Sequence, residues 1–275
     1  MPKIKLPLII SDFDGTLVRT DGTIGEYTKN AIEKYIQDGG KFAVCTGRGP
    51  QSILQRTEEL GLKGIVSCYQ GAAIFDAESG KMLLEGTIPT ERALPVVQEM
   101  ERLGLHIHIY GKDDFYSNMD DKAFRDYEKV VRIKGKVEEN LSRFMQETNF
   151  CPYKMMVMIP PAQKDKVFAH FSNLFGEEFY VTASADFLVE VCNKKYSKPT
   201  GVQYIADYFG VALEDSAAVG DQWNDMPMLE CVGHGFAVKN AHEHLKERAT
   251  VLAYTNEEDA VGHLIEEYGY EKENE

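Results

Sequence analysis

Short apolar segments alternate with amphipathic segments through the first third of the chain. Unbroken apolar runs predict buried strands at 6–10 (LPLII), 41–46 (KFAVCT) and 64–69 (GIVSCY). Between them, apolar residues recur at helical spacing, which predicts helices at 25–39 and 50–61. Strands that are apolar throughout and separated by helices are typical of a parallel sheet covered on both faces. This part of the chain therefore predicts an α/β fold.

The last third of the chain repeats the same alternation. A helix is predicted at 198–210, where Pro199 stands in the first turn and Gly210 at the end. The remaining pattern predicts strands at 217–221, 235–238 and 250–254, and helices at 226–233, 241–249 and 257–269. Because both ends of the chain share this pattern, we expect them to complete one sheet together.

The middle of the chain has a different pattern. Residues 105–110 (LHIHIY) alternate apolar and polar positions, as a half-exposed strand does. Further elements are predicted as strands at 153–161 and 187–192 and as a helix at 163–176. This mixture predicts an α+β unit with an antiparallel sheet. We interpret it as a second domain at 83–189, inserted into a first domain formed by 1–82 and 190–275.

The composition narrows the classes of function. The 275 residues carry a formal net charge of −14, which argues against a surface for nucleic acid or for an anionic membrane. The five cysteines are scattered and form no CxxC pair, so neither a disulfide framework nor a zinc site is indicated. The apolar run near the N-terminus is too short for a signal peptide, and no segment reaches the length of a membrane span. We expect a cytoplasmic protein without nucleic-acid or membrane partners.

Polar side chains follow three of the predicted strands. Asp12 and Asp14 come just after the first strand, Thr46 ends the second, and Asp221 ends the strand at 217–221. Ligands of open parallel sheets bind beyond the carboxyl ends of the strands, so we expect these side chains at one edge. Carboxylates that lie so near to one another repel unless a cation, a proton or a substrate lies between them. A few carboxylates together with a phosphate are a typical ligand set for Mg²⁺.

A phosphate site is predicted at the same edge. Residues 46–53 (TGRGPQSI) pass from a strand end through a glycine turn into a helix, whose first N–H groups favour anions. The hydroxyl of Thr46 can donate to the same phosphate, and Lys198 stands at the start of another helix. Together these groups predict a phosphate held between a cation, a lysine and a helix N-terminus.

Four short motifs carry a resemblance to a known family. The segments 12–16 (DFDGT), 46–48 (TGR), 197–202 (SKPTGV) and 220–225 (GDQWND) occur in the order of the four motifs of the haloacid dehalogenase superfamily. The inserted domain resembles the C2-type cap of its subclass IIB, the Cof-like phosphatases. The resemblance covers almost the whole chain and implies a Rossmann-like parallel-sheet core with an inserted α+β cap domain.

The resemblance implies a role for each catalytic residue. Asp12 would be the nucleophile that forms an aspartyl-phosphate intermediate. Asp14 would protonate the leaving alcohol and then take a proton from the hydrolytic water. Thr46 and Lys198 would bind the phosphoryl oxygens that are not transferred.

The resemblance also implies the metal and substrate ligands. Mg²⁺ would be held by Asp12, by the backbone carbonyl of Asp14 and by Asp221. Asn224 and Asp225 would complete the outer shell of the metal site, with Asp225 orienting a metal-bound water or Lys198. The implied substrate-binding residues are Thr46, Gly47, Arg48, Lys198 and Asn224.

Two positions depart from the family pattern, and a pair of histidines has two readings. Gln70 stands where asparagine is usual, which leaves the substrate contacts of that turn open. Lys239 stands where glycine is usual, either as a surface lysine or as a charge that favours a more anionic substrate. His106 and His108 share one face of their predicted strand, where packing is preferred over a metal pair.

The sequence therefore predicts a Mg²⁺-dependent phosphomonoesterase of small phosphorylated metabolites, with sugar phosphates as the favoured class. We expect a monomer or a small homo-oligomer. Two alternatives stay open: a phosphosugar mutase of the same superfamily, and a non-catalytic sensor of a phosphorylated metabolite. The physiological substrate and the cap residues that select it do not follow from the sequence.

Overall fold

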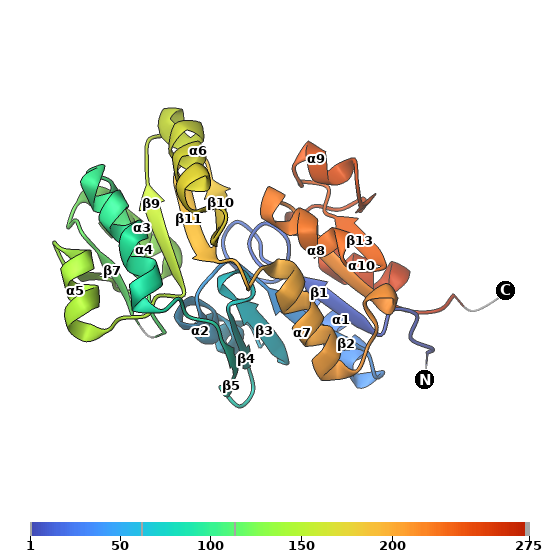
Figure 1. The fold of residues 1–275 in the computed structure, drawn as a ribbon. Helices are drawn as coiled ribbons and strands as arrows, with labels where there is room; N and C mark the ends of the chain where they lie inside the picture. The colour runs from blue at the N-terminus through green and yellow to red at the C-terminus, as the bar shows by residue number, and fades with distance from the viewer. Residues whose placement is uncertain (1, 62, 113, 273–275) are drawn as a thin grey trace.

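Two β-sheets organise the residues described by the computed structural model, which are 2–61, 63–112 and 114–272 (Figure 1). The core sheet has eight strands in the order β14 (Thr250–Val251), β13 (His234–Ala237), β12 (Ser216–Gly220), β1 (Leu8–Ser11), β2 (Lys41–Cys45), β3 (Ile65–Cys68), β4 (Ala73–Asp76) and β5 (Met82–Glu85). Strands β14 to β3 run parallel, and β4 and β5 continue the sheet in antiparallel pairing. Both ends of the chain thus share one sheet, as expected.

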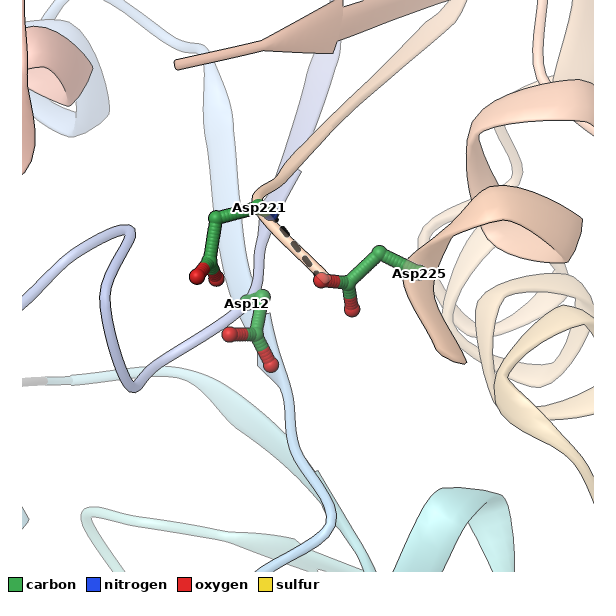
Figure 2. A group of neighbouring side chains, drawn as sticks. All are labelled: Asp12, Asp221 and Asp225. Carbon is green, nitrogen blue, oxygen red and sulfur yellow. Dashed lines mark hydrogen bonds between the residues drawn. The ribbon is translucent and has the colours of Figure 1, made fainter. Parts of the chain in front are cut away.

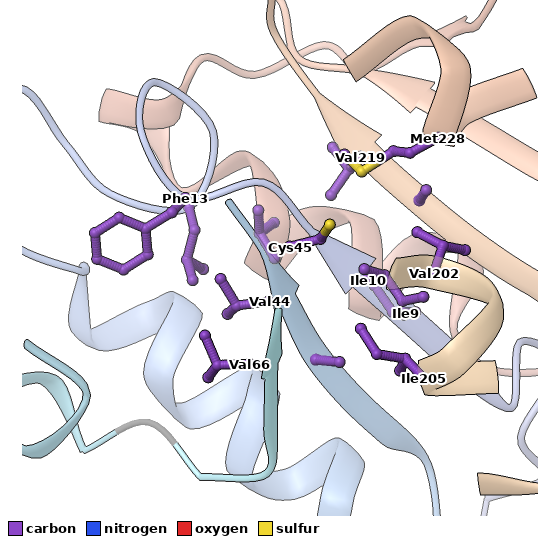
Figure 3. Close-up of a cluster of buried hydrophobic side chains, with 14 of the residues drawn as sticks. Ile9, Ile10, Phe13, Val44, Cys45, Val66, Val202, Ile205, Val219 and Met228 are labelled. Atoms are coloured by element: carbon purple, nitrogen blue, oxygen red, sulfur yellow. The ribbon is translucent and has the colours of Figure 1, made fainter. Parts of the chain in front are cut away.

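Helices cover both faces of the core sheet. They are α1 (Glu26–Gln37), α2 (Pro50–Leu60), α7 (Lys198–Phe209), α8 (Met226–Glu230), α9 (Glu243–Lys246) and α10 (Ala260–Tyr268). Figure 3 shows Phe13, Val44 and Val66 on one side of the strands, and Ile205 of α7 on the other. Strands β1 and β12 are buried along their whole length, which is why their sequences are apolar throughout. This confirms the predicted α/β core.

The inserted unit, called the cap below, is built on a second sheet. Its six strands have the order β10 (Phe179–Ala185), β11 (Leu188–Asn193), β9 (Lys154–Met158), β6 (His106–Tyr110), β7 (Phe115–Ser117) and β8 (Lys136–Val137) within the described residues. Only the β7–β8 pair among them is parallel. The cap helices are α3 (Thr90–Arg102), α4 (Lys122–Val131), α5 (Leu141–Thr148) and α6 (Lys164–Phe175). The cap forms the green and yellow part of Figure 1, beside the carboxyl ends of β1 and β2.

The predicted domain boundaries fall inside two strands. β5 pairs with β4 in the core sheet, and β11 pairs with β9 and β10 in the cap sheet. The chain therefore leaves the core sheet after Glu85 and the cap sheet after Asn193, a few residues later than the breaks at 82/83 and 189/190. An apolar run shows that a strand exists, but its hydrogen-bonding partner decides to which sheet it belongs.

Several local predictions differ from the structure. The alternating segment at 105–110 predicts a half-exposed strand, yet all five residues of β6 are buried because both of its faces are covered. The helix predicted at 241–249 is reduced to the single turn α9, and the strand at 250–254 to β14. Helices α3, α4 and α5 have no counterpart in the sequence analysis. Within the described residues, no helix is long and apolar enough to cross a membrane.

Candidate active site

Three strand ends of the core sheet lie side by side and position the candidate catalytic residues. Asp12 follows β1, and its N–H donates to the carbonyl of Val219 on β12 at 2.9 Å. Thr46 follows β2, and its N–H donates to Ser67 on β3 at 2.8 Å. Asp221 follows β12. The parallel register therefore brings residues more than two hundred positions apart to one edge of the sheet.

Asp12, Asp221 and Asp225 form a compact carboxylate cluster (Figure 2). One oxygen from each residue lies within 4.8 Å of the others, and the residues are only 6%, 5% and 0% exposed. Hard divalent cations such as Mg²⁺ prefer carboxylate oxygens, usually a few of them together with water and phosphate. The composition and spacing of this cluster therefore fit a magnesium ion.

Burial gives the cluster unusual protonation behaviour. Burial, followed by the negative charge of Asp225, raises the pKa of Asp12 well above its ordinary value. The same two causes raise the pKa of Asp221 to about 6. Both side chains thus resist carrying a charge unless positive charge is close by. A divalent cation would supply that charge and favour the ionised forms.

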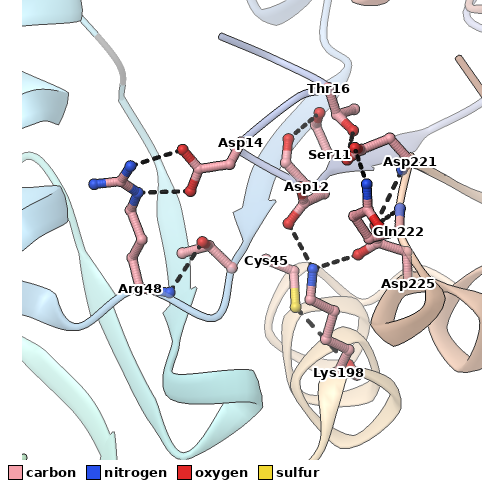
Figure 4. Close-up of polar contacts among 11 residues, drawn as sticks. Ser11, Asp12, Asp14, Thr16, Cys45, Arg48, Lys198, Asp221, Gln222 and Asp225 are labelled. Carbon is pink, nitrogen blue, oxygen red and sulfur yellow. Dashed lines mark hydrogen bonds and ion pairs between the residues drawn. The ribbon is translucent and has the colours of Figure 1, made fainter. Parts of the chain in front are cut away.

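Lys198 supplies one fixed positive charge to the cluster. It begins α7, whose start is fixed by a capping box between Ser197 and Thr200. Its ammonium group donates to Asp12 Oδ1 at 2.5 Å and also to Asp225 Oδ1 (Figure 4). Burial alone would lower the pKa of Lys198, but the charges of Asp12 and Asp225 raise it, so the ammonium stays protonated.

Asp225 holds the loop of the fourth motif together. Its Oδ2 accepts from the backbone N–H of Asp221 at 3.0 Å and of Gln222 at 2.9 Å. Its Oδ1 accepts from Lys198. With both oxygens engaged in this way, Asp225 orients Lys198 and the Asp221 backbone, which is the geometry of a supporting residue.

Two side chains position Asp221, one from the first motif and one from the fourth, and the sequence analysis missed both. Thr16 donates its hydroxyl to Asp221 Oδ1 at 2.9 Å, and Gln222 donates to Asp221 Oδ2 at 3.2 Å. Gly15 has a φ of +74°, and a Cβ there would lie 2.5 Å from Asp221 Oδ2. The close approach of this carboxylate therefore requires glycine at that position. In the sequence, the Gly15–Thr16 pair that ends the DFDGT motif was the signal for the role of Thr16.

Asp14 points away from the carboxylate cluster and is held by Arg48 (Figure 4). The guanidinium makes a two-pronged contact, with Nε 2.6 Å from Oδ2 and Nη2 2.8 Å from Oδ1. The side chain of Asp14 is half exposed, whereas that of Arg48 is only 17% exposed. Arg48 thus contacts the predicted acid–base residue, where the sequence analysis predicted a contact with substrate.

The remaining predicted residues surround a cavity of about 370 Å³ between the core and the cap. Thr46 is buried, and its Oγ1 accepts from the N–H of Arg48 at 3.1 Å, which shapes the turn into α2. Gly47 and Asn224 line the same cavity. From the cap, polar and apolar side chains complete its wall, namely Tyr110, Tyr127, Val130, Val131, Ile133, Lys154, Phe187, Leu188 and Glu190.

The positions left open by the sequence have clear environments. Gln70 is buried in the cavity wall, with a left-handed backbone at φ 58° and ψ 34°. Lys239 is exposed and is not among the described residues that line this cavity, which favours the reading as a surface lysine. The Nε2 atoms of His106 and His108 lie 3.2 Å apart, so one donates to the other, which agrees with packing.

Comparison with known proteins identifies the family. A family model described as haloacid dehalogenase-like hydrolase matches residues 9–265. Phosphatase YwpJ of Bacillus subtilis (strain 168) is 27% identical over 284 residues, covering 94% of this chain and 99% of YwpJ. From the same organism, the 5-amino-6-(5-phospho-D-ribitylamino)uracil phosphatase YitU is 28% identical over 274 residues, covering 95% and 97%. The solved structure of the subclass IIB sugar phosphatase BT4131 has a TM-score of 0.79 at 21% identity, covering 95% of this chain and 98% of that one.

The chain belongs to the haloacid dehalogenase-like hydrolase family. Its fold is that of the Cof-like subclass IIB, with a parallel-sheet core and an inserted cap, as the four motifs and the inserted domain together predicted. The prediction of a phosphatase is confirmed by the family and by the names of both relatives.

Proposed function

We propose that this protein is a Mg²⁺-dependent phosphomonoesterase that hydrolyses small phosphorylated metabolites through an aspartyl-phosphate on Asp12. The observation that carries the proposal is the buried contact between Lys198 and Asp12 Oδ1, inside a cluster of three carboxylates. A lysine so placed fixes one oxygen of Asp12 and leaves Oδ2 as the attacking atom. A carboxylate nucleophile divides one difficult displacement into two easier ones.

The metal is assigned to the carboxylate cluster. Asp12 and Asp221 would hold Mg²⁺ directly, together with the backbone carbonyl of Asp14, while Asp225 and Asn224 support them from outside. When bound, the ion offsets the repulsion between the carboxylates and the incoming phosphate. The chain's own contribution is to keep Asp221 oriented, through Thr16 and Gln222.

The phosphate and the leaving group are assigned to the turn after β2 and to Asp14. Thr46, the backbone of Gly47 and Lys198 would bind the phosphoryl oxygens that are not transferred. Asp14 would donate a proton to the leaving oxygen and then accept one from water. To reach that oxygen, its carboxylate exchanges one of its two contacts with Arg48 for the substrate.

The substrate class is supported by the relatives and by the cap. YitU is named for a phosphorylated ribityl compound, and BT4131 is named a sugar phosphatase. Both names support a small metabolite with a hydroxylated carbon chain. The cap side chains that line the cavity leave room for such a molecule but not for a folded phosphoprotein. A cytoplasmic location and a monomeric or small homo-oligomeric state remain predictions.

The proposal is tested by phosphate release from p-nitrophenyl phosphate, with Mg²⁺ and with a chelator, by the wild type and by Asp12→Asn. We expect turnover that requires Mg²⁺ and falls by at least about 10³-fold in Asp12→Asn, because an amide cannot act as the nucleophile. Rapid acid quenching of the wild type should trap phosphate on Asp12. If Asp12→Asn retains full activity, the assigned nucleophile is wrong.

A further inference from the structure

We propose that Lys154 of the cap is a positioning residue of the active site, which holds the phosphate-binding turn of the core in place through the carbonyl of Gly47. This inference rests on the proposed phosphatase function and deepens it, because it gives the cap a part in phosphate binding. Lys154 is the first residue of β9 and lines the cavity, and its Nζ lies 3.4 Å from the carbonyl oxygen of Gly47. The contact joins the cap to the core across 107 positions of the chain.

Gly47 is the residue of this turn with the greatest backbone freedom. A Cβ at Gly47 would lie 2.8 Å from Gln70 Nε2, and Gln70 is buried, so close packing favours glycine at this position. Glycine loses more conformational entropy than any other residue when its backbone is held in one conformation. The peptide group that follows Gly47 therefore needs contacts from other parts of the molecule to keep one orientation.

Two contacts hold that peptide group at its opposite ends. Its N–H, which belongs to Arg48, donates to Thr46 Oγ1 at 3.1 Å. Its C=O, which belongs to Gly47, accepts from the ammonium group of Lys154. A peptide group is planar, so its N–H and its C=O turn together, and Lys154 thereby keeps the N–H directed at Thr46. Since Thr46 Oγ1 accepts that hydrogen bond, its own hydroxyl hydrogen is left to donate to a phosphoryl oxygen.

A buried ion pair keeps Lys154 charged and oriented. Lys154 and Glu190 are only 5% and 2% exposed, and Nζ lies 3.0 Å from Glu190 Oε1. Cys192 of β11 pairs with Lys154 of β9, so Glu190 is the diagonal neighbour of Lys154 on the same face of the cap sheet. The ammonium also lies 4.8 Å from the ring centroid of Tyr110. Burial alone would lower the pKa of Lys154, but the charge of Glu190 raises it, so the ammonium stays protonated.

Stability alone does not explain this ion pair. Replacing a buried ion pair by apolar residues of similar volume often leaves the free energy of unfolding unchanged or increases it. Apolar packing already joins this part of the cap to the core, because Tyr153 stacks on Tyr69 with ring centroids 5.1 Å apart. What Lys154 adds is a charged donor directed at a backbone carbonyl, a stronger contact than a neutral hydrogen bond.

The first experiment measures the binding of inorganic phosphate, which occupies the turn without any leaving group. Titration calorimetry with Mg²⁺ present compares the wild type with Lys154→Met. We expect the Kd for phosphate to rise about tenfold, because a hydrogen bond from a charged donor is lost. The Kd for Mg²⁺ without phosphate should stay the same, since the candidate metal ligands follow β1 and β12. An unchanged Kd for phosphate, or an equal rise in the Kd for Mg²⁺, would overturn the inference.

The second experiment distinguishes support of the phosphate-binding turn from a contact with the leaving group. The kcat/KM values of p-nitrophenyl phosphate, glycerol 3-phosphate and ribose 5-phosphate are compared in both proteins. Lys154→Met should lower kcat/KM about tenfold for every ester that the wild type hydrolyses, because all of them share the phosphate-binding turn. A loss confined to one leaving group would make Lys154 a residue that selects the substrate, and would overturn the inference. A wild type that neither binds phosphate nor hydrolyses any ester would refute the proposed function, and the inference with it.

Two further variants separate the contact with Gly47 from the cost of an unpaired charge. Lys154→Met leaves the charge of Glu190 buried, which destabilises the protein. The double variant Lys154→Met/Glu190→Gln removes both charges, so it should regain melting temperature but keep the weakened binding of phosphate. Lys136→Met is the control: it removes a cap lysine that is paired with Asp114 and is not among the described residues that line the cavity, and it should leave the Kd for phosphate unchanged. Phosphate binding restored to the wild-type value in the double variant would show that the buried charge caused the loss, and would overturn the inference.

Discussion

At the scale of single residues, Thr16 shows how a side chain without chemistry of its own controls a reactive one. Its hydroxyl donates to Asp221 Oδ1, and the neighbouring Gly15 leaves the space for that contact. Asp221 is otherwise held only by Gln222, at the longer distance of 3.2 Å, among the side-chain contacts that the structure gives it. The orientation of the candidate metal ligand therefore depends mainly on one threonine hydroxyl.

Replacing Thr16 should weaken the binding of Mg²⁺ without removing a ligand. In Thr16→Val, Asp221 loses its closest donor, and we expect the Mg²⁺ concentration for half-maximal activity to rise about tenfold, as with other supporting residues of metal sites. Thr16→Ser keeps the hydroxyl and should behave almost as the wild type. The measurement is a Mg²⁺ activation curve for all three proteins, and coinciding curves would show that Thr16 has no part in metal binding.

At the scale of elements, the turn that leads into α2 and the first residues of that helix join the core to the cap. Ser52 donates to the carbonyl of Val131 at 2.8 Å, and Arg48 donates to that of Val130 at 3.4 Å. Both carbonyls stand at the end of α4, where helical partners are missing. Gln51 makes a similar contact with Gly111 at the end of β6, at 3.0 Å. We call these hydrogen bonds the α2 latch. Arg48 also donates two hydrogen bonds to Asp14. Closure of the cap is therefore linked to the position of Asp14, the proposed acid–base residue.

Loss of the α2 latch should reduce activity with little effect on folding. Ser52→Ala removes one hydrogen bond of the closed cap, worth about 1 kcal/mol, so kcat/KM should fall about fivefold. Ser79→Ala, in the exposed turn between β4 and β5, is the matched control and should leave kcat/KM unchanged. If the melting temperature of Ser52→Ala falls so far that unfolding alone explains the lost activity, the substitution destabilises the whole protein and does not act through cap closure.

At the scale of the whole molecule, the sequence predicts which strand ends form the site better than it predicts the side-chain contacts within the site. The ends of β1, β2 and β12 follow from apolar runs, and their common edge follows from parallel pairing. Side-chain pairs such as Thr16 with Asp221, 205 positions apart, depend on the final packing and have no local signal. The same holds for Lys154 and Glu190, whose strands meet only once the cap sheet has formed.

The buried strand β6 shows the other limit of sequence patterns. The alternation of histidine and isoleucine predicts a strand with one solvent-exposed face. Instead, His106 and His108 are hydrogen-bonded to each other, and they also contact Ser117 and Tyr110, respectively. Burial lowers the pKa of His108 well below its ordinary value, so the ring is neutral and tolerates the interior. Periodicity cannot show that polar side chains will satisfy one another.

The carboxylate cluster makes the stability of the whole molecule depend on pH and on metal. An acid whose pKa is raised by folding binds its proton more tightly in the folded state. Its favourable contribution is complete below the unfolded pKa near 4 and is lost as the pH rises through the folded value. For Asp221 that folded value is about 6, so the metal-free protein should lose stability between about pH 4 and pH 7.

Asp221→Asn isolates this effect, because the amide has nearly the same shape and can still accept from Thr16, but carries no charge. In a chelator at about pH 7.5, the variant should be more stable than the wild type by on the order of 2 kcal/mol, and the difference should shrink towards zero at about pH 4.5. Urea unfolding at both values of pH measures the two free energies. Addition of Mg²⁺ should then stabilise the wild type at the higher pH and leave Asp221→Asn almost unchanged, since the variant lacks the ligand. A wild type that is the more stable protein in chelator at both pH values would mean that the clustered charges are compensated within the chain, and that the cluster needs no cation.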